Sequence, residues 1–205
     1  TDLSLRIHAH PEVAFQEFRA SQWLSEYLDG NGFSVERGIA DLPTAFKAVY
    51  GTGKPLIGFL AEYDALPKLG HACGHNIIAA SAVGGAVALR GLVQETGGTL
   101  VVMGTPAEEG GGGKIIMAQK GAFEGLDVAM LVHPSVANRA NMNTLARIAL
   151  QVDYYGKAAH ASARPQDGIN ALDAMIFAFN AVNSLRHHIR PGSRIHGVIT
   201  HGGDA

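Results

Sequence analysis

The sequence predicts an α/β fold in which helices flank a mainly parallel sheet. Short apolar runs typical of buried strands alternate with longer segments of helical character, and three of the runs end at acidic or imidazole side chains. Such alternation is typical of parallel sheets, because a crossover helix returns the chain to the edge where the next strand begins. From residue 144 onward the pattern changes and predicts the start of a second, α+β domain.

Helical spacing of apolar residues predicts a helical region at residues 2–31, which a Gly-Asn-Gly segment ends. Two short apolar runs, 46–50 and 56–61, are separated by a turn rich in glycine, so each predicts a strand. The apolar run at 77–93 is rich in small residues and predicts a core helix that is too short to span a bilayer.

The next predicted elements are a strand at 99–103, a helix at 114–120 and a strand at 126–132. Together these segments make residues 1–143 the N-terminal part of the first domain.

Residues 144–205 predict the first part of the second domain. Partial alternation at 146–155 predicts a strand with one solvated face, the apolar positions of 170–188 predict a long helix, and 195–200 predict another strand. Because no element closes this domain, we expect the 205 residues to be part of a longer chain.

Composition and charge exclude several classes of protein. The chain is 47% apolar and 17% charged, which is typical of folded domains. A formal charge of −2 without a Lys/Arg cluster predicts no nucleic-acid partner and no membrane partner. Cys73 is the only cysteine, and the N-terminus carries no apolar leader, so we expect a cytoplasmic protein.

Side chains of metal-ligand type follow three of the predicted strands. Asp64 follows the second strand, Glu108 and Glu109 follow the third, and His133 follows the fourth. Parallel α/β sheets place their binding sites beyond the carboxyl ends of the strands. Residues far apart in the sequence are therefore expected to meet at one edge of the sheet.

The segment between the second strand and the next helix is rich in metal-ligand chemistry. Its candidate side chains are Glu62, Asp64, His71, Cys73 and His75. Thiolate and imidazole suit zinc and neighbouring metals, and the start of a helix favours the thiolate form of Cys73. The segment therefore predicts a site for a divalent cation.

Four motifs resemble those of the aminoacylase-1/carboxypeptidase G-type metallopeptidase family. They are EYDALP at 62–67, HACGHN at 71–76, PAEEG at 106–110 and GKAAHA at 156–161. Within the family they are most similar to the amidohydrolase branch, which contains aminoacylase-1-like dipeptidases, aminobenzoyl-glutamate hydrolase and auxin–amino acid hydrolases. The motifs follow the family's order over nearly the whole chain.

The resemblance implies a phosphorylase/hydrolase-like catalytic domain interrupted by an inserted lid domain, which usually mediates formation of a homodimer. It also implies two divalent metal ions, zinc first, with manganese or cobalt as alternatives. The implied reaction is hydrolysis of a dipeptide or an N-acyl amino acid by a metal-activated water, with a glutamate as general base. Glu62, Tyr63 and Asn76 favour the dipeptidase subgroup.

Carried over residue by residue, four side chains match the family's metal ligands: Cys73 as the bridging ligand, His75, Glu109 and His133. Glu108 matches the general base, Asp64 the acidic residue that orients the site, and His160 the lid histidine that reaches toward the substrate. Neighbours on extended backbone point to opposite sides, which suits a division of the two adjacent glutamates into base and ligand. The family's last histidine ligand is expected beyond residue 205.

Alternatives remain open. An aminobenzoyl-glutamate-type or other N-acyl-amino-acid amidohydrolase would use the same site on another substrate. A cysteine hydrolase would use Cys73 with His71 or His75 as its base. The non-enzyme alternative is an inactive dimerisation or ligand-binding module, and we expect residues 1–205 alone to be inactive. Glu62 stands where other branches carry a metal-binding histidine, and it receives no role from the resemblance.

Four glycines at 110–113 followed by Lys114 resemble a phosphate-binding loop only in part. The Walker pattern requires glycine at position 108 and serine or threonine at 115, where this chain has Glu108 and Ile115. We interpret the glycines as residues that let the backbone pass close to the metal site.

Overall fold

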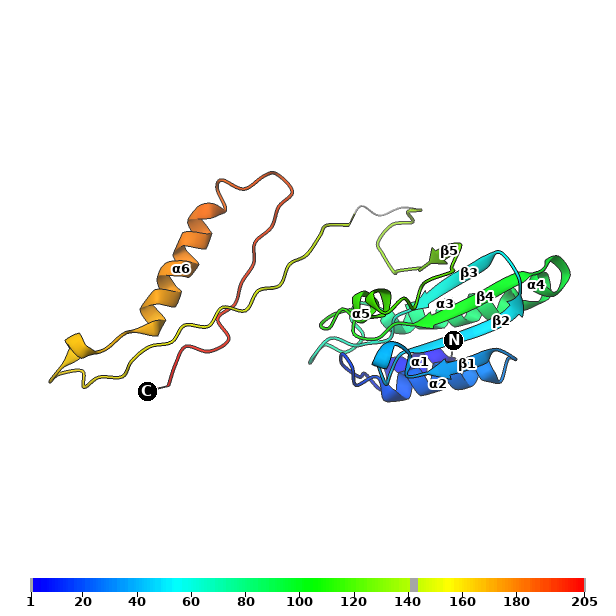
Figure 1. Cartoon of the computed structure of the whole chain (residues 1–205), viewed down its shortest axis with the longest axis horizontal. Coiled ribbons are helices and arrows are strands. Elements are labelled where there is room, and N and C mark those ends of the chain that lie inside the picture. The colour runs from blue at the N-terminus through cyan, green and yellow to red at the C-terminus, as the bar shows by residue number, and fades with distance from the viewer. Residues whose placement is uncertain (1, 141–143, 205) are drawn as a thin grey trace. The chain divides into compact units, whose positions relative to one another are not determined.

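A computed structural model describes residues 2–140 and 144–204 of the chain (Figure 1). The chain divides into two compact units, Thr1–Ala140 and Asn141–Ala205. The assignment of the units as catalytic and lid domains stays a prediction.

The first unit is built on a five-stranded sheet with the order β1-β2-β4-β3-β5. Its strands are β1 (Ser34–Arg37), β2 (Phe46–Thr52), β3 (Leu56–Ala61), β4 (Gly98–Gly104) and β5 (Val128–Met130). β3 pairs in parallel with β4 on one side and β5 on the other, whereas β1 pairs antiparallel with β2, and β2 antiparallel with β4. The predicted α/β class is confirmed, and the parallel strands are those that lead to the candidate site.

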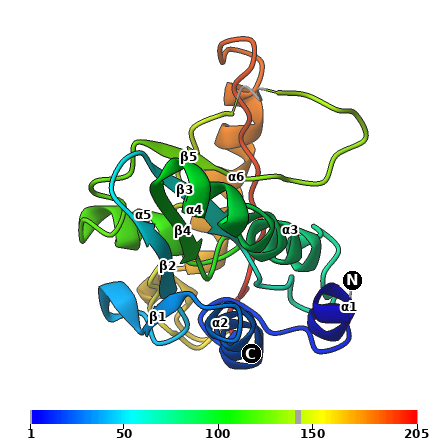
Figure 2. The same ribbon diagram turned by 90° about the vertical axis from the view of Figure 1, so that its right-hand side faces the viewer.

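Three helices cover one face of this sheet with their apolar sides. The helices α1 (Asp2–His8), α2 (Phe18–Asp29) and α3 (His75–Ala88) share a core with the side chains of Leu100 and Val102 on β4. Successive residues of a strand point to opposite faces, so Val101 and Met103 belong to a second core on the other face. That core includes Met117 of α5 (Gly113–Gln119), and Figure 2 shows α3 and α5 on opposite sides of the strands.

Two predicted helices differ from the observed ones. The predicted region 2–31 is two helices, because residues 9–17 leave helical geometry and form a β-bridge between Val13 and Ala65. The predicted helix 77–93 begins at His75 and is divided at Leu89 into α3 and α4 (Arg90–Thr96). β1 was not predicted, because three of its four residues are polar and exposed, and only Val35 is apolar.

The consecutive helices α3 and α4, His75–Thr96, are long and apolar enough to cross a membrane by length and composition. However, α3 packs on β3 and β4 and buries Ala79, Val83 and Ala86 in the core. We interpret α3 as the core helix that the sequence predicts.

The second unit contains one long helix, α6 (Ala171–Leu185), and a short 3-10 helix at Pro165–Asp167. The side chain of Asn170 caps α6 by accepting hydrogen bonds from the backbone N–H groups of Leu172 and Asp173. The predicted long helix is therefore present, with its start one residue after the predicted position.

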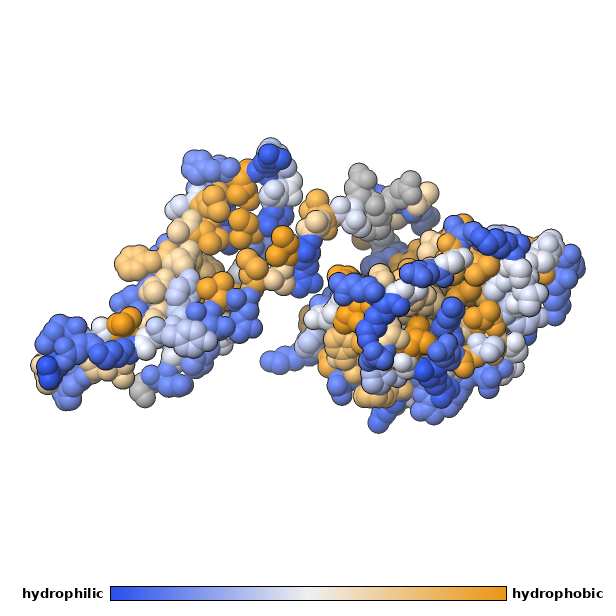
Figure 3. All heavy atoms as spheres, viewed as in Figure 1, coloured by the Kyte–Doolittle hydropathy of each residue, from blue (hydrophilic) through white to orange (hydrophobic). Residues whose placement is uncertain are grey.

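The predicted strands at 146–155 and 195–200 were wrong, since no strand occurs within residues 144–204. A strand requires a neighbour that satisfies its backbone groups, and only an isolated bridge between Lys157 and Ile169 forms here. Apolar side chains of this unit, such as Leu150 and Phe177, are exposed. Figure 3 shows orange, hydrophobic residues on the surface of this unit.

The first core makes a direct prediction about stability. Replacing the fully buried Leu24 of α2 with alanine leaves a cavity and should lower the free energy of unfolding by about 2–5 kcal/mol. Leu5→Ala on α1 is the matched control, because Leu5 is 62% exposed and its loss should change stability by less than about 0.5 kcal/mol. Urea unfolding followed by circular dichroism measures both, and equal losses would contradict this description of the core.

Candidate active site and metal centre

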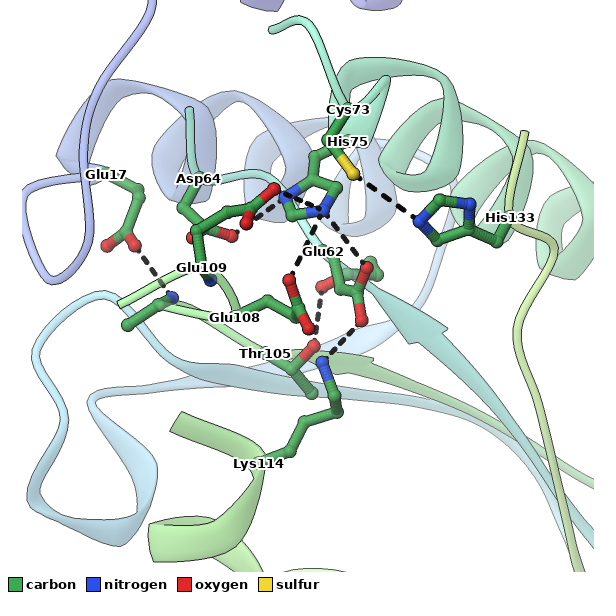
Figure 4. A network of polar contacts seen from close by, with 12 residues as sticks. Glu17, Glu62, Asp64, Cys73, His75, Thr105, Glu108, Glu109, Lys114 and His133 are labelled. Atoms are coloured by element: carbon green, nitrogen blue, oxygen red, sulfur yellow. Dashed lines mark hydrogen bonds and ion pairs between the residues drawn. The ribbon is translucent and has the colours of Figure 1, made fainter. Parts of the chain in front are cut away.

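The candidate site lies beyond the carboxyl ends of β4, β3 and β5, three neighbouring strands that run parallel. Glu62 and Asp64 follow β3, Glu108 and Glu109 follow β4, and His133 follows β5. His75 is the first residue of α3, and Figure 4 shows that it lies among these side chains. The convergence expected from the strand ends is therefore present.

His75 is the central residue of the site, and its side chain is fully buried. Its Nδ1–H donates a hydrogen bond of 2.9 Å to Oδ1 of Asp64, so the other ring nitrogen, Nε2, carries the free lone pair. That Nε2 is buried and has no hydrogen-bond partner. It lies 3.5 Å from a carboxylate oxygen of Glu62, 3.7 Å from one of Glu108 and 3.8 Å from one of Glu109.

Asp64 connects this histidine to the glutamate pair. Its Oδ1 accepts from His75, and its Oδ2 accepts from the backbone N–H of Glu109 at 2.9 Å. Burial alone would raise the pKa of Asp64, but the hydrogen bonds and the charge of His75 outweigh it and hold the pKa below its usual value. The carboxylate therefore stays ionised and orients both neighbours.

The pKa of His75 shifts in the opposite direction. Burial lowers it, but the hydrogen bond to Asp64 and the charges of Asp64, Glu62 and Glu109 raise it by more, so the net pKa lies above the ordinary value. The surroundings thus favour a positive charge at the position of this ring.

Two groups of possible metal ligands meet at His75. One consists of Cys73, His75 and His133, and the other of His75, Glu108 and Glu109; within each group the ligand atoms lie within 4.8 Å of one another. The thiol sulfur of Cys73 is 3.6 Å from Nε2 of His133. The structure thus brings together all four side chains predicted as ligands, together with the predicted base, while their individual roles stay predictions.

These residues fit a divalent cation. The buried, partnerless Nε2 of His75 has a lone pair that only a proton or a metal could use, and carboxylates surround it. Two ligand atoms bound about 2.1 Å from one tetrahedral ion lie about 3.4 Å apart, and the distances of 3.5 to 3.8 Å around Nε2 are close to that value. Imidazole, thiol and carboxylate form a donor set suited to zinc and its neighbours.

Cys73 differs from the expectation based on its position before a helix. Burial, a hydrogen bond with Glu109 and the negative charges of Glu109, Glu108 and Glu62 raise the pKa of its thiol to about 11. The prediction that the helix start favours the thiolate was wrong for the metal-free site, because burial and the neighbouring carboxylates favour the neutral thiol. A bound divalent cation would reverse this balance and deprotonate the thiol.

Sequence reasoning left Glu62 without a role and did not consider Lys114 as its partner. Glu62 is buried, its Oε1 pairs with the ammonium of Lys114 on α5, and its Oε2 faces His75 without a hydrogen bond. Its position at the end of β3, beside Asp64, was the available signal. Lys114 was considered only as part of a phosphate loop.

Three glycines of the 110–113 loop are required by specific close contacts or by a backbone angle, which the sequence alone did not show. A side chain at Gly111 would overlap the ring of Phe15, and one at Gly113 would overlap the backbone carbonyl of Pro106. Gly112 has a φ of +64°, where glycine is favoured. The loop therefore packs against residues 9–17 and against itself.

His160 belongs to the second unit, where its side chain is exposed. Its Nδ1 accepts hydrogen bonds from the backbone N–H groups of Ser162 at 3.3 Å and Ala163 at 3.2 Å. Its predicted contact with the substrate stays a prediction.

Comparisons with known proteins agree with the resemblance seen in the motifs. The model of peptidase family M20/M25/M40 matches residues 58–191. The chain is 42% identical to a Xaa-Arg dipeptidase of Mus musculus, over 98% of this chain and 50% of the relative. It is 38% identical to a p-aminobenzoyl-glutamate hydrolase polypeptide of Escherichia coli, over 99% of this chain and 46% of the relative.

Among solved structures, a dinuclear metal-binding peptidase of the M20 family from Bacillus subtilis matches with a TM-score of 0.56 and 27% identity, over 62% of this chain and 40% of that one. The chain spans about half the length of the curated relatives it matches.

The raised pKa of Cys73 makes a prediction about its reactivity. Only the thiolate reacts with iodoacetamide, so the rate for the metal-free protein should rise about tenfold per pH unit and level off only near the pKa of about 11. The urea-unfolded protein is the control and should level off near the ordinary value of about 8.5. Mass spectrometry of the single cysteine measures both rates, and a plateau in the folded protein below about pH 9 would contradict the raised pKa.

Proposed function

Because the chain belongs to peptidase family M20/M25/M40, we propose that it contributes most of the active site of a dinuclear metal-dependent hydrolase that cleaves the amide bond of a dipeptide or an N-acyl amino acid. The observation that carries the proposal is the buried, partnerless Nε2 of His75, which lies where two groups of potential ligands meet.

Cys73, His75, Glu109 and His133 would hold the two ions, as the motifs predict. Zinc is the first candidate and manganese or cobalt are alternatives, because the set combines a thiol, two imidazoles and a carboxylate. Such ions, when bound, supply Lewis-acid polarisation of the amide carbonyl and a nucleophilic water at neutral pH.

Glu108 is the proposed general base. Its side chain is 40% exposed, more than any other carboxylate around His75, so it can face both the site and an incoming substrate. In this role it takes a proton from the attacking water and delivers it to the nitrogen of the leaving amino acid. Asp64 supports the reaction indirectly, because it fixes the ring of His75 and the backbone of Glu109.

The names of two relatives, a Xaa-Arg dipeptidase and an aminobenzoyl-glutamate hydrolase, support an amide of an amino acid as the substrate class. We favour a dipeptide, because the higher identity is to the dipeptidase and Glu62, Tyr63 and Asn76 favour that subgroup.

We further propose that residues 144–205 act as a lid that brings His160 to the substrate and contributes to a homodimer. The family model extends through residue 191 and so includes most of this unit, which supports the assignment. A cytoplasmic location is proposed because a free thiol suits a reducing compartment.

The rival is a cysteine hydrolase, which the sequence predicts with His71 or His75 as the base. The histidine that contacts Cys73 in the structure is His133, whose Nε2 lies 3.6 Å from the sulfur. A thiol with a pKa of about 11 is a poor nucleophile at neutral pH, which favours the metal-ligand role. If Cys73 binds metal, prior loading with zinc will block its alkylation; activity that survives chelation but not alkylation would support the rival.

Metal removal gives the first test of the proposed function. The purified protein at its full natural length should lose its dipeptidase or acylase activity on dialysis against a chelator and regain it with zinc, manganese or cobalt. A panel of dipeptides and N-acyl amino acids measures the activity, with metal content determined in parallel. Activity that is indifferent to metal would contradict the proposal.

Glu108→Gln gives the second test, because it keeps the shape of the side chain and removes the base. We expect kcat to fall by about 10²–10⁴-fold while two metal ions stay bound. Glu95→Gln on the exposed surface of α4 is the matched control and should leave kcat unchanged. A near-normal kcat for Glu108→Gln would remove this residue from the role of base.

A further inference from the structure

We propose that Glu17 is a positioning residue that sets the direction of Glu108 and Glu109 by holding the backbone of Ala107, and that it acts as a hydrogen-bond acceptor. The inference rests on the proposed function, because it concerns the two glutamates assigned there as base and ligand. No motif assigned a role to Glu17, which lies before α2 and is fully buried.

The carboxylate of Glu17 joins three segments that are distant in the sequence. Its Oε1 accepts from the backbone N–H of Phe15 at 2.9 Å and from that of Ala107 at 2.8 Å. Its Oε2 accepts from the hydroxyl of Thr44 at 2.9 Å. Figure 4 shows the side chain reaching across to the loop that carries the two glutamates.

Glu17 occupies a position from which a side chain usually caps its own helix. It is the N-cap residue of α2 but makes no capping hydrogen bond. The carboxylate of Glu12 takes that role instead, because it accepts from the backbone N–H groups of Arg19 and Ala20. Glu17 is thus free to hold the loop after β4.

Ala107 requires such support. Its φ is +56°, a left-handed conformation that costs a residue with a Cβ about 1–2 kcal/mol. Such backbone persists only where its surroundings hold it. Glu17 binds the N–H of Ala107, and the carbonyl of Ala107 accepts from the N–H of Gly111 at 3.1 Å.

The backbone around Glu108 is therefore held on both sides by buried carboxylates. Glu17 binds the residue before it, and Asp64 binds the N–H of Glu109 after it. The left-handed residue sets the direction in which the chain leaves β4, and with it the approach of both glutamates to Nε2 of His75. Without Glu17, the strain at Ala107 would favour an ordinary backbone conformation and rotate both side chains.

The acceptor geometry of Glu17 matters more than its charge, because its three partners are two N–H groups and a hydroxyl. In a glutamine at this position, Oε1 could keep both backbone bonds while the amide donates to the oxygen of Thr44. An aspartate keeps the charge but is one methylene shorter, so it cannot reach Ala107 from the same backbone.

The variants E17Q and E17D separate geometry from charge. We expect E17Q to keep kcat within about threefold of the parent and E17D to lose about 10²-fold in kcat, with a smaller change in KM. Ser25→Ala is the matched control, because it removes a buried hydrogen bond that stays within α2 and holds no part of the loop after β4. It should leave both kcat and exchange at residues 105–110 unchanged.

Hydrogen exchange of the backbone gives a second readout that needs neither activity nor metal. Exchange of the peptide covering residues 105–110 should be roughly tenfold faster in E17D and unchanged in E17Q. A failure of the proposed function would show as absence of hydrolysis by the parent protein, while this comparison still tests Glu17.

The proposal is overturned if E17D has the same kcat and the same exchange rate at residues 105–110 as the parent. It is also overturned if E17Q loses as much kcat as E17D. If E17D does not fold, E17Q decides together with Thr44→Val, which frees Oε2 and should accelerate exchange at 105–110. Parent-like exchange in Thr44→Val would then overturn the proposal.

Discussion

The site depends on one buried carboxylate, that of Asp64, which accepts hydrogen bonds from the ring of His75 and from the backbone of Glu109. His75 is the first residue of α3, and Glu109 lies in the loop after β4. Asp64 therefore connects the helix on one face of the sheet with the loop at the carboxyl end of β4. Because His75 must donate through Nδ1, its Nε2 is left free toward the ligand groups. The chemistry of the site follows from this choice of ring nitrogen.

The surrounding charges are unfavourable to one another without a cation. Glu62, Glu108 and Glu109 lie within 4 Å of the same imidazole nitrogen, and they raise the pKa of the nearby thiol of Cys73. Such clustering costs stability, and proteins retain it where it serves function. Lys114 relieves part of the repulsion through its ion pair with Glu62, and bound cations would relieve the rest.

Much of the fold and site could be predicted because strands and ligand-type side chains leave local signals. The strand at 56–61 was predicted with its observed bounds, and the family resemblance of the four motifs is confirmed by the match to residues 58–191. The role of Glu17 could not be found in this way, because its partner Ala107 lies 90 residues away and has no distinctive side chain. The strands expected after residue 144 failed because alternation predicts an exposed and a covered face but does not supply a pairing partner.

By itself the sequence determined which side chains end the parallel strands, because apolar runs and the polar residues after them are local properties of the chain. It thereby determined the donor chemistry of the site. Only the tertiary structure decided how those donors are used: that Asp64 holds His75 through Nδ1, that Glu62 pairs with Lys114, and that burial and carboxylates raise the pKa of Cys73. These outcomes depend on distances between segments far apart in the sequence, and electrostatic energies are set by those distances.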